Sequence, residues 1–260
     1  MSNENNARVC KLYLEFDDSN VEHARAQLMT QGFLKSHNYP KVLDVFLELA
    51  DQGDRTFQHN AGVLLQCIDE VRDYQQAFSW YKKSVAQDFA PAKERLACMY
   101  EFGDGGMPVD LKAAIRLYSE SAEQGNIHSA YNLGMILAKG SNCCERNLPL
   151  ALSLLLTAAD QGHALMKFNL GIIYLEDCDN AQAANQWFKL AFDQDSVVSV
   201  DLGHYYLERY KANKDKERSA ALSHYWFATA LAYSHQDLVL DIFNGDHAVL
   251  TTFKFQGRFH

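Results

Sequence analysis

The clearest pattern of apolar and polar positions lies in the stretch 110–140. In its first half, residues three or four positions apart form one apolar face of an α-helix, at Ala114, Leu117, Tyr118 and Ala122. Gly125 provides a stop for this helix, and a second apolar stripe follows at Ala130, Leu133, Gly134 and Leu137. The pattern predicts two amphipathic helices joined by a turn. Neither helix can bury its stripe alone, so the pair has to pack against neighbours.

The same two-helix pattern recurs along the chain. The second helices of successive units end 35, 37, 37, 33 and 39 residues apart, at Gly53, Asp88, Gly125, Gly162, Asp195 and Ser234. A pair of adjacent large apolar residues stands at the same position of each repeat, shortly before the end of the second helix. These pairs are Val45-Phe46, Trp80-Tyr81, Leu117-Tyr118, Leu154-Leu155, Trp187-Phe188 and Trp226-Phe227. The first helices carry a small residue instead, at Gly62, Ala97, Gly134, Gly171 and Gly203. We expect the small residue to admit the partner helix and the large pair to fill the space between units.

Helical pairs that contact only their neighbours form a quasi-one-dimensional stack with atypical units at its ends. The sequence therefore predicts an all-α protein, a right-handed α-solenoid of about five to six stacked helix-turn-helix repeats. We expect residues 1–38 to form an N-terminal segment with a degenerate capping helix, and residues 39–235 to form the repeats. Residues 236–260 are expected to contain a capping helix at 236–243 and a frayed tail from Gly257.

The residues shared by these units resemble the Sel-one-like repeat, a longer relative of the tetratricopeptide repeat. The best copy is 92–125, with Leu96, Ala97, Tyr100, Gly103, Gly105, Val109, Asp110, Ala113, Leu117, Tyr118, Ala122, Gln124 and Gly125. The unit 126–162 is nearly as good. Two departures are the loop EDCDNA, which lacks the paired glycines, and a charged insertion at 211–218. The resemblance covers residues 39–235 and implies a repeat scaffold, because the family supplies scaffolds, adaptors and regulators.

Composition narrows the choice of partner. An apolar content of 48% and a charged content of 22% are those of a globular protein. The net charge of -9 argues against binding to nucleic acid or to a membrane surface, and favours a neutral or basic protein partner. The chain shows no secretory signal pattern and no apolar run of about 18 residues. Its six cysteines fall at different phases of the repeat. We therefore expect a cytoplasmic protein with free thiols.

The sequence carries no recognisable catalytic or cofactor motif. Neither a phosphate-binding loop nor a nucleophile elbow is present, and the ten histidines include no H-E-x-x-H. Gly103, Gly105 and Gly106 with Asp104 resemble a phosphate or calcium loop, but their place between two repeat helices favours a simple turn. Adjacent Cys143 and Cys144 lack the spacing of a metal site, so incidental thiols are favoured over a metal or redox role. We expect a protein that is not an enzyme and binds neither cofactor nor metal.

The remaining candidate site is the surface formed by the first helices. In stacked helical hairpins we expect these helices to line a concave groove, so certain positions around each small residue should face a ligand. The chosen residues are His59, Glu94, Glu101, Phe102, Tyr131, Met135, Lys139, Phe168, Glu176, His204 and Glu208. Neighbouring apolar positions such as Val63, Ile172, Leu175 and Leu207 suit the groove and inter-unit packing equally well. Apolar anchors beside carboxylates predict capture of a basic or apolar segment of another protein or peptide.

Two functions fit this surface. The first is a protein interaction scaffold or adaptor that binds a peptide or protein segment in the groove. The second is an inhibitor or immunity-type protein that neutralises one toxin or effector by direct binding. Tight one-to-one binding of a single enzyme, with loss of that enzyme's activity, would separate the second from the first.

Overall fold

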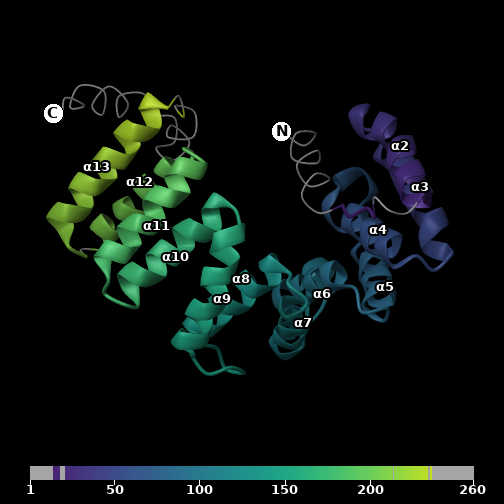
Figure 1. Ribbon diagram of the computed structural model, residues 1–260, viewed down its shortest axis with the longest axis horizontal. Helices are drawn as coiled ribbons and strands as arrows, with labels where there is room; N and C mark the ends of the chain where they lie inside the picture. The colour runs from purple at the N-terminus through teal and green to yellow at the C-terminus, as the bar shows by residue number, and fades with distance from the viewer. Residues whose placement is uncertain (1–13, 18–20, 213, 234, 236–260) are drawn as a thin grey trace. The chain divides into compact units, whose positions relative to one another are not determined.

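The computed structural model describes residues 14–17, 21–212, 214–233 and 235. Twelve α-helices occupy this part of the chain, with two short 3-10 helices and one isolated bridge between Ser141 and Cys144 (Figure 1). The α-helices are α2 (Val21–Lys35), α3 (Tyr39–Asp51), α4 (Arg55–Cys67), α5 (Tyr74–Val85), α6 (Ala90–Phe102), α7 (Leu111–Glu123), α8 (Ile127–Lys139), α9 (Leu148–Gln161), α10 (Ala164–Glu176), α11 (Ala181–Gln194), α12 (Val198–Lys211) and α13 (Lys216–Ala232). The 3-10 helices are η1 (Asp69–Val71) and η2 (Asp104–Gly106).

The predicted all-α repeat fold is confirmed. The second helices α3, α5, α7, α9, α11 and α13 each end within three residues of the end that the sequence pattern marks. The capping helix predicted at 236–243 and the frayed tail lie outside the described residues. The division at residues 38 and 235 stays a prediction.

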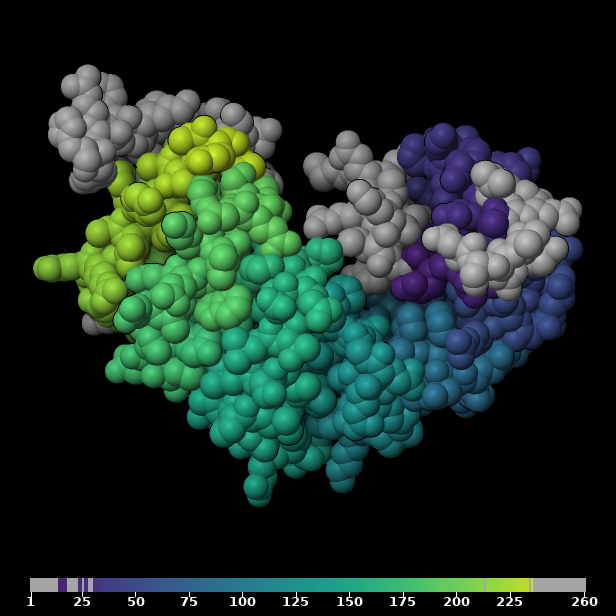
Figure 2. Space-filling view, in the orientation of Figure 1, coloured from purple at the N-terminus to yellow at the C-terminus, as the bar shows by residue number. Residues whose placement is uncertain are grey.

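The chain divides into two compact units, Met1–Leu154 and Leu155–His260, so the boundary falls within α9. In the first unit, α4 packs against α5 and α6 packs against α7, while α3, α5 and α7 each contact the helix that follows. In the second unit, α10 packs against α11 and α12 packs against α13. Within each unit the colours in Figure 2 follow one another in chain order, which agrees with packing between neighbours in sequence.

Side-chain caps start many of the helices. An Asp or Asn directly before the helix accepts a hydrogen bond from a backbone N–H of the first turn, which would otherwise lack a partner within the helix. This arrangement is seen at Asn38, Asp54, Asp73, Asp110, Asn126 and Asn180. The loop 103–106 is the simple turn that its position predicted, with positive φ at all three of its glycines.

Glycines in three first helices contact an aromatic ring of the following second helix. A Cβ atom built on Gly62 would lie 2.6 Å from the Tyr81 ring, on Gly171 2.5 Å from the Phe188 ring, and on Gly203 2.6 Å from the Phe227 ring. These three rings are almost completely buried. The expectation that a small residue admits the large apolar pair is confirmed at these positions.

Three glutamines at one repeat position tie each unit to the one before it. Each directly precedes the end residue of its own unit, and its Nε2 donates to the end residue of the preceding unit. The bonds are from Gln87 to the Gly53 carbonyl (2.9 Å), from Gln124 to the Asp88 carboxylate (2.9 Å) and from Gln194 to the Gly162 carbonyl (3.2 Å). The glutamine that the sequence places here is therefore a contact between consecutive repeats.

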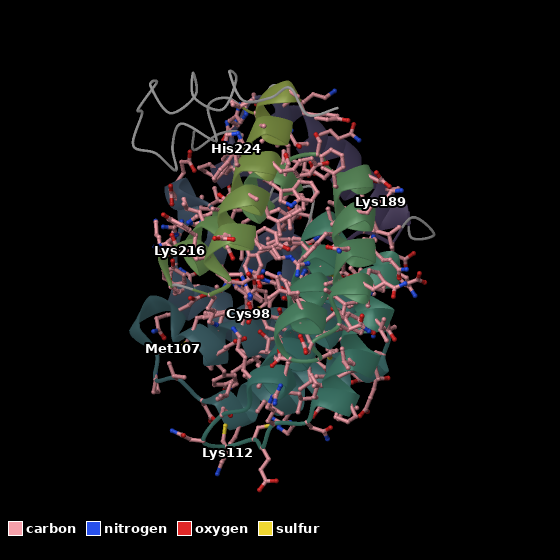
Figure 3. All side chains as sticks on the ribbon, turned by 90° about the vertical axis from the view of Figure 1, so that its left-hand side faces the viewer. Cys98, Met107, Lys112, Lys189, Lys216 and His224 are labelled. Atoms are coloured by element: carbon pink, nitrogen blue, oxygen red, sulfur yellow. The ribbon has the colours of Figure 1, made fainter. Side chains whose placement is uncertain are left out.

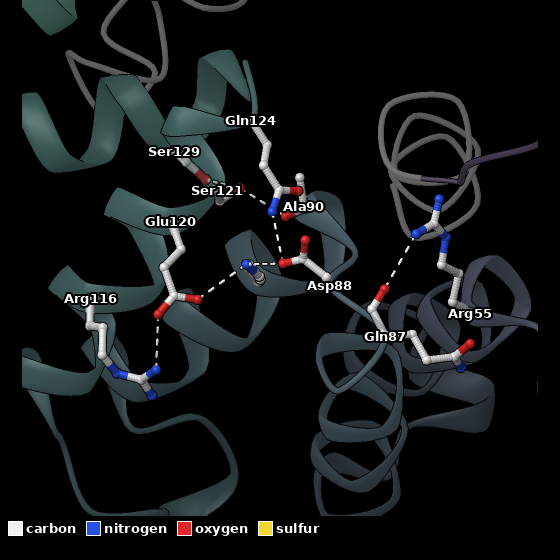
Figure 4. Close-up of polar contacts among 10 residues, drawn as sticks. Arg55, Gln87, Asp88, Ala90, Arg116, Glu120, Ser121, Gln124 and Ser129 are labelled. Carbon is white, nitrogen blue, oxygen red and sulfur yellow. Dashed lines mark hydrogen bonds and ion pairs between the residues drawn. The ribbon is translucent and has the colours of Figure 1, made fainter.

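Around Asp88 this contact extends into an ionic network (Figure 4). The buried Lys93 donates to Asp88 and lies 3.1 Å from the Glu120 carboxylate. Arg116 in turn contacts Glu120 at 3.0 Å. The hydrogen bonds from Lys93 and Gln124 lower the pKa of Asp88. Lys93 therefore joins α6 to the turn before it through Asp88 and to α7 through Glu120.

The glycine contact predicts opposite effects for two Gly→Ala changes in the first unit. Gly62→Ala should lower the free energy of unfolding by about 1–3 kcal/mol, because the new methyl group overlaps the packed Tyr81 ring. Gly32→Ala in α2 is the matched control, since a Cβ there meets nothing within 4 Å. It should raise stability by up to about 1 kcal/mol through helix propensity. Chemical denaturation of both variants measures the difference, and equal effects would contradict the close-contact explanation.

Candidate functional site

The N-terminal segment 14–17 lies against α4, the first helix of the repeat that follows α3. The carboxamide of Asn60 accepts from the backbone N–H of Glu15 at 2.9 Å and donates to the Glu15 carbonyl at 2.7 Å. Phe16 adds edge contacts to Phe46 and Phe57. The segment and its neighbours bury α4 on all sides between Thr56 and Gln66. The surface of this helix is therefore occupied by the chain itself.

Gln66 joins α4 to α5 and α6. Its Oε1 accepts from the Tyr81 hydroxyl at 3.0 Å and from Arg95 Nη2 at 2.7 Å, and its Nε2 donates to Asp104 at 2.6 Å. Arg95 also donates to Cys67 Sγ at 3.3 Å. Gln66 and Arg95 are more than nine-tenths buried. Satisfied polar groups of this kind fix one arrangement of the helices, because any other would leave buried donors unpaired.

Five side chains from three helices meet around Cys98, which is labelled in Figure 3. We name Glu94, Cys98 and Glu101 of α6, Tyr118 of α7 and Asn132 of α8 the Cys98 cluster. The thiol donates to Glu94 Oε1 at 3.2 Å, and the Tyr118 hydroxyl lies 3.1 Å from Cys98 Sγ and 2.8 Å from Glu101 Oε2. Asn132 Nδ2 lies 4.0 Å from Cys98 Sγ. The cluster therefore brings side chains of two consecutive first helices together.

The cluster carries two carboxylates and two neutral proton donors. Burial raises the pKa of the Cys98 thiol well above its ordinary value, and it also raises the pKa of the Tyr118 hydroxyl. Both groups therefore keep their protons at neutral pH. Neither Glu94 nor Glu101 forms an ion pair within the described part of the chain. Glu94 is buried and interacts electrostatically with Arg95 of the same helix, so Glu101 is the carboxylate of the cluster that is better placed for a cationic group.

In the second unit, the predicted acidic residues already have cationic partners. Glu176 of α10 contacts Arg209, accepts from the Tyr205 hydroxyl at 2.5 Å and lies 3.7 Å from Lys214. Burial alone would raise the pKa of Glu176, but these hydrogen bonds and charges outweigh it and lower the pKa. Glu208 is paired with Lys211 at 2.7 Å and lies 3.7 Å from His204. These carboxylates attract a further cation less strongly than Glu101.

Three of the predicted ligand-facing residues are buried, and the expectation that they are exposed is wrong. His59, Glu94 and Phe168 are 1%, 6% and 7% exposed. Each lies three residues before the small residue of its helix. Because an α-helix advances by about 100° per residue, this position is turned only about 60° from the side that faces the second helix. It therefore points largely into the packing between helices.

The other predicted residues keep access to solvent. Phe102 is 67% exposed, and Lys139, Glu176 and Glu208 are also exposed. These four lie five residues after the small residue, about 140° from the packed side. His204 is exposed, while Glu101, Tyr131 and Met135 are partly exposed. Their role in partner binding stays a prediction, since exposure alone assigns no ligand.

Four residues of these contacts were not predicted from the sequence: Asn60, Arg95, Tyr118 and Asn132. Tyr118 appeared only as an apolar core residue, yet its hydroxyl joins the Cys98 cluster. One signal was available: an asparagine stands two residues before the small residue in three of the five first helices, at Asn60, Asn132 and Asn169. This position is turned about 160° from the packed side, so its recurrence points to the free face of the helix.

The cysteines provide no clear alternative site. Cys67, Cys98, Cys143 and Cys144 are free thiols. Cys143 and Cys144 lie in the loop between α8 and α9, where Ser141 and Cys144 exchange backbone hydrogen bonds of 2.8 and 3.3 Å. Across the described residues, no three His, Cys, Asp or Glu side chains come together in a way that could hold a metal ion. Likewise, none of the described helices has the length and apolar character that crossing a membrane requires.

A family model of the Sel1 repeat matches residues 68–89, 90–126, 127–163 and 167–196. No curated protein has a significantly similar sequence. Among solved structures, a protective antigen of uropathogenic Escherichia coli strains with an SLR fold aligns with a TM-score of 0.64 at 24% identity. A Sel1 repeat protein from Oxalobacter formigenes aligns with a TM-score of 0.58 at 23% identity. Each alignment covers 80% of this chain, but only 44% and 60% of those two proteins.

An immunity protein from Pseudomonas aeruginosa aligns with a TM-score of 0.52 at 15% identity. This alignment covers 86% of this chain and 85% of the immunity protein. At such identities the three likenesses show a shared helical repeat fold.

The contact between Asn60 and Glu15 gives a direct prediction. Asn60→Ala removes both hydrogen bonds to the Glu15 backbone, so the Glu15 amide should exchange its proton roughly tenfold faster or more. Hydrogen–deuterium exchange followed by mass spectrometry of the N-terminal peptide measures this change. Asn132→Ala is the matched control, because it removes the same side chain at the same repeat position without touching the segment. Unchanged exchange in Asn60→Ala would show that the two bonds do not hold the segment.

Proposed function

Because the chain belongs to the Sel1 repeat family, whose helical scaffolds generally mediate protein–protein interaction, we propose that it captures a segment of another protein on the first helices α6 and α8. The segment carries an apolar side chain next to a lysine or arginine. The protein acts by binding rather than by catalysis. We expect a cytoplasmic setting, because the six cysteines fall at different phases of the repeat and so do not form a regular disulfide ladder.

The pair Glu101 and Phe102 supports this proposal most directly. Phe102 is a large apolar side chain that is two-thirds exposed at the end of α6. Directly before it, Glu101 accepts a hydrogen bond from Tyr118, and it has no ion pair among the described residues. Exposed aromatic side chains act as anchors at protein interfaces, and adjacent charges select the partner. The pair is therefore suited to an apolar side chain with a basic neighbour.

The arrangement of charge favours the first unit over the second. Glu176 and Glu208 are neutralised by Arg209, Lys211 and Lys214. Glu94 is buried and interacts electrostatically with Arg95. Of the four glutamates in the predicted groove, Glu101 alone combines partial exposure with the absence of a cationic partner in the described ranges. A test of the proposed function should begin with this residue and its neighbour.

An inhibitor or immunity-type protein is the second candidate. Its support is the alignment with the immunity protein of Pseudomonas aeruginosa, which covers both chains nearly end to end. The same surface would serve here, because an inhibitor also binds a segment of another protein. The two candidates differ in what happens to the partner: an adaptor leaves it active, whereas an inhibitor blocks it.

The double variant Glu101→Lys with Phe102→Ala should lose its partner selectively. We expect at least a roughly tenfold drop in captured protein, since an anchor and its charge are both removed. Affinity capture from the native lysate with quantitative mass spectrometry measures the loss. Glu48→Lys on the exposed side of α3 is the control for charge. The same proteins bound by both forms would place the interaction elsewhere.

The captured partner also separates the two candidates. It is purified and titrated with the wild-type protein while its own activity is followed. Loss of activity at one-to-one stoichiometry identifies an inhibitor, and retained activity in the complex identifies an adaptor.

A further inference from the structure

Asn60 shows how a first helix of this protein holds a polypeptide main chain. One carboxamide both accepts from the N–H and donates to the C=O of the same residue, Glu15. The N–H and C=O of one residue point to the same side only in an extended chain, as in the hydrogen-bonded pairs of an antiparallel sheet. The two bonds involve no atom of the Glu15 side chain. An asparagine at this position therefore recognises the backbone of an extended segment and not the identity of its side chains.

The same side chain recurs in later repeats. Asn132 lies two residues before Gly134, as Asn60 lies two residues before Gly62. The side of α4 that carries Gly62 packs against Tyr81 of the second helix. Asn60, two positions earlier, is turned about 160° from that side and therefore points away from the second helix. Asn169 has this position before Gly171 in the second unit. In the repeat between Asn60 and Asn132 the position is taken by Arg95, which binds Gln66 and Cys67.

Asn132 differs from Asn60 in what it contacts. Asn60 is completely buried beneath the segment 14–17, whereas Asn132 is partly exposed. Among the described residues, the Asn132 carboxamide has only the long 4.0 Å contact from Nδ2 to Cys98 Sγ. Its Oδ1 accepts no hydrogen bond from the described residues. The group that holds the backbone in one repeat is thus available in another.

We propose that Asn132 binds the backbone of an extended segment of the partner protein through a pair of hydrogen bonds, in the way that Asn60 binds Glu15. The occupant is a partner segment with a lysine or arginine, because the partly exposed Glu101 of the same cluster has no ion pair among the described residues. The proposal rests on the proposed function and specifies how the segment is held. Backbone recognition by Asn132 gives affinity, while Glu101 and Phe102 select the sequence.

The test uses a phage-displayed library of random dodecapeptides selected on the full-length protein. Selected peptides are synthesised, and their affinities are measured by fluorescence polarisation. Asn132→Ala should weaken binding roughly tenfold, since two hydrogen bonds to the peptide are lost. Asn185→Ala is the control, because it removes the same exposed carboxamide from the second helix α11 and should change nothing.

A second measurement identifies the backbone as the contact. In each selected peptide, amide groups are replaced one at a time by esters, which removes a single N–H while keeping every side chain. One ester should weaken binding to the wild type by several-fold and should have no further effect in Asn132→Ala. This loss of sensitivity distinguishes a direct contact from a merely structural effect of the mutation.

The outcomes separate this inference from the proposed function. Equal affinities of the wild type and Asn132→Ala, or an ester effect that persists in the variant, overturn backbone recognition by Asn132. If Glu101→Lys with Phe102→Ala still abolishes binding, the proposed surface stands without it. If the library yields no peptide that prefers the wild type over that double variant, both proposals fail. Displacement of the selected peptides by the synthetic peptide VCKLYLEFDD, residues 9–18, would make the chain's own segment the occupant and overturn the partner assignment.

Discussion

The close contact between a first-helix glycine and a second-helix aromatic ring sets the geometry on which the other features depend. At Gly62, Gly171 and Gly203 the ring lies where a Cβ atom would be, so the two helix backbones approach closely. This contact fixes which side of each first helix is packed. Every other position on that helix then has a defined angle from the packed side. The angle decides whether a polar residue there joins the core or remains available to a ligand.

The positions of the repeats could be predicted from the sequence, whereas the contacts at the surface could not. The apolar pattern located the second-helix ends within three residues, because the spacing of the large pair reflects contacts between neighbours in sequence. The surface depends on contacts that leave no such pattern. Asn60 meets Glu15 across 45 residues, and Glu176 meets Arg209 across 33. His59 and Glu94 were misplaced because the rule for exposed positions included one that is turned only about 60° from the packed side.

The two units use their acidic residues differently. In the second unit, Arg209 and Lys214 neutralise Glu176. The Glu176 carboxylate therefore joins α10 to α12 and to the loop that follows α12. In the first unit, the carboxylates of the Cys98 cluster are hydrogen-bonded to a thiol and a phenol instead. Neutral donors orient a carboxylate without removing its charge. An oriented carboxylate that keeps its charge can still pair with a cation from another molecule.

The two asparagines Asn60 and Asn132 differ in what covers them. The segment 14–17 lies over α4, where Phe16 packs on Phe46 and Phe57 and Asn60 binds the backbone of Glu15. The chain thus uses, for its own stability, a contact that suits the binding of a foreign chain. Among the described residues, no segment forms such a contact with Asn132, which has only a long contact to Cys98. The cover over the asparagine, rather than any difference in its chemistry, therefore separates the two roles.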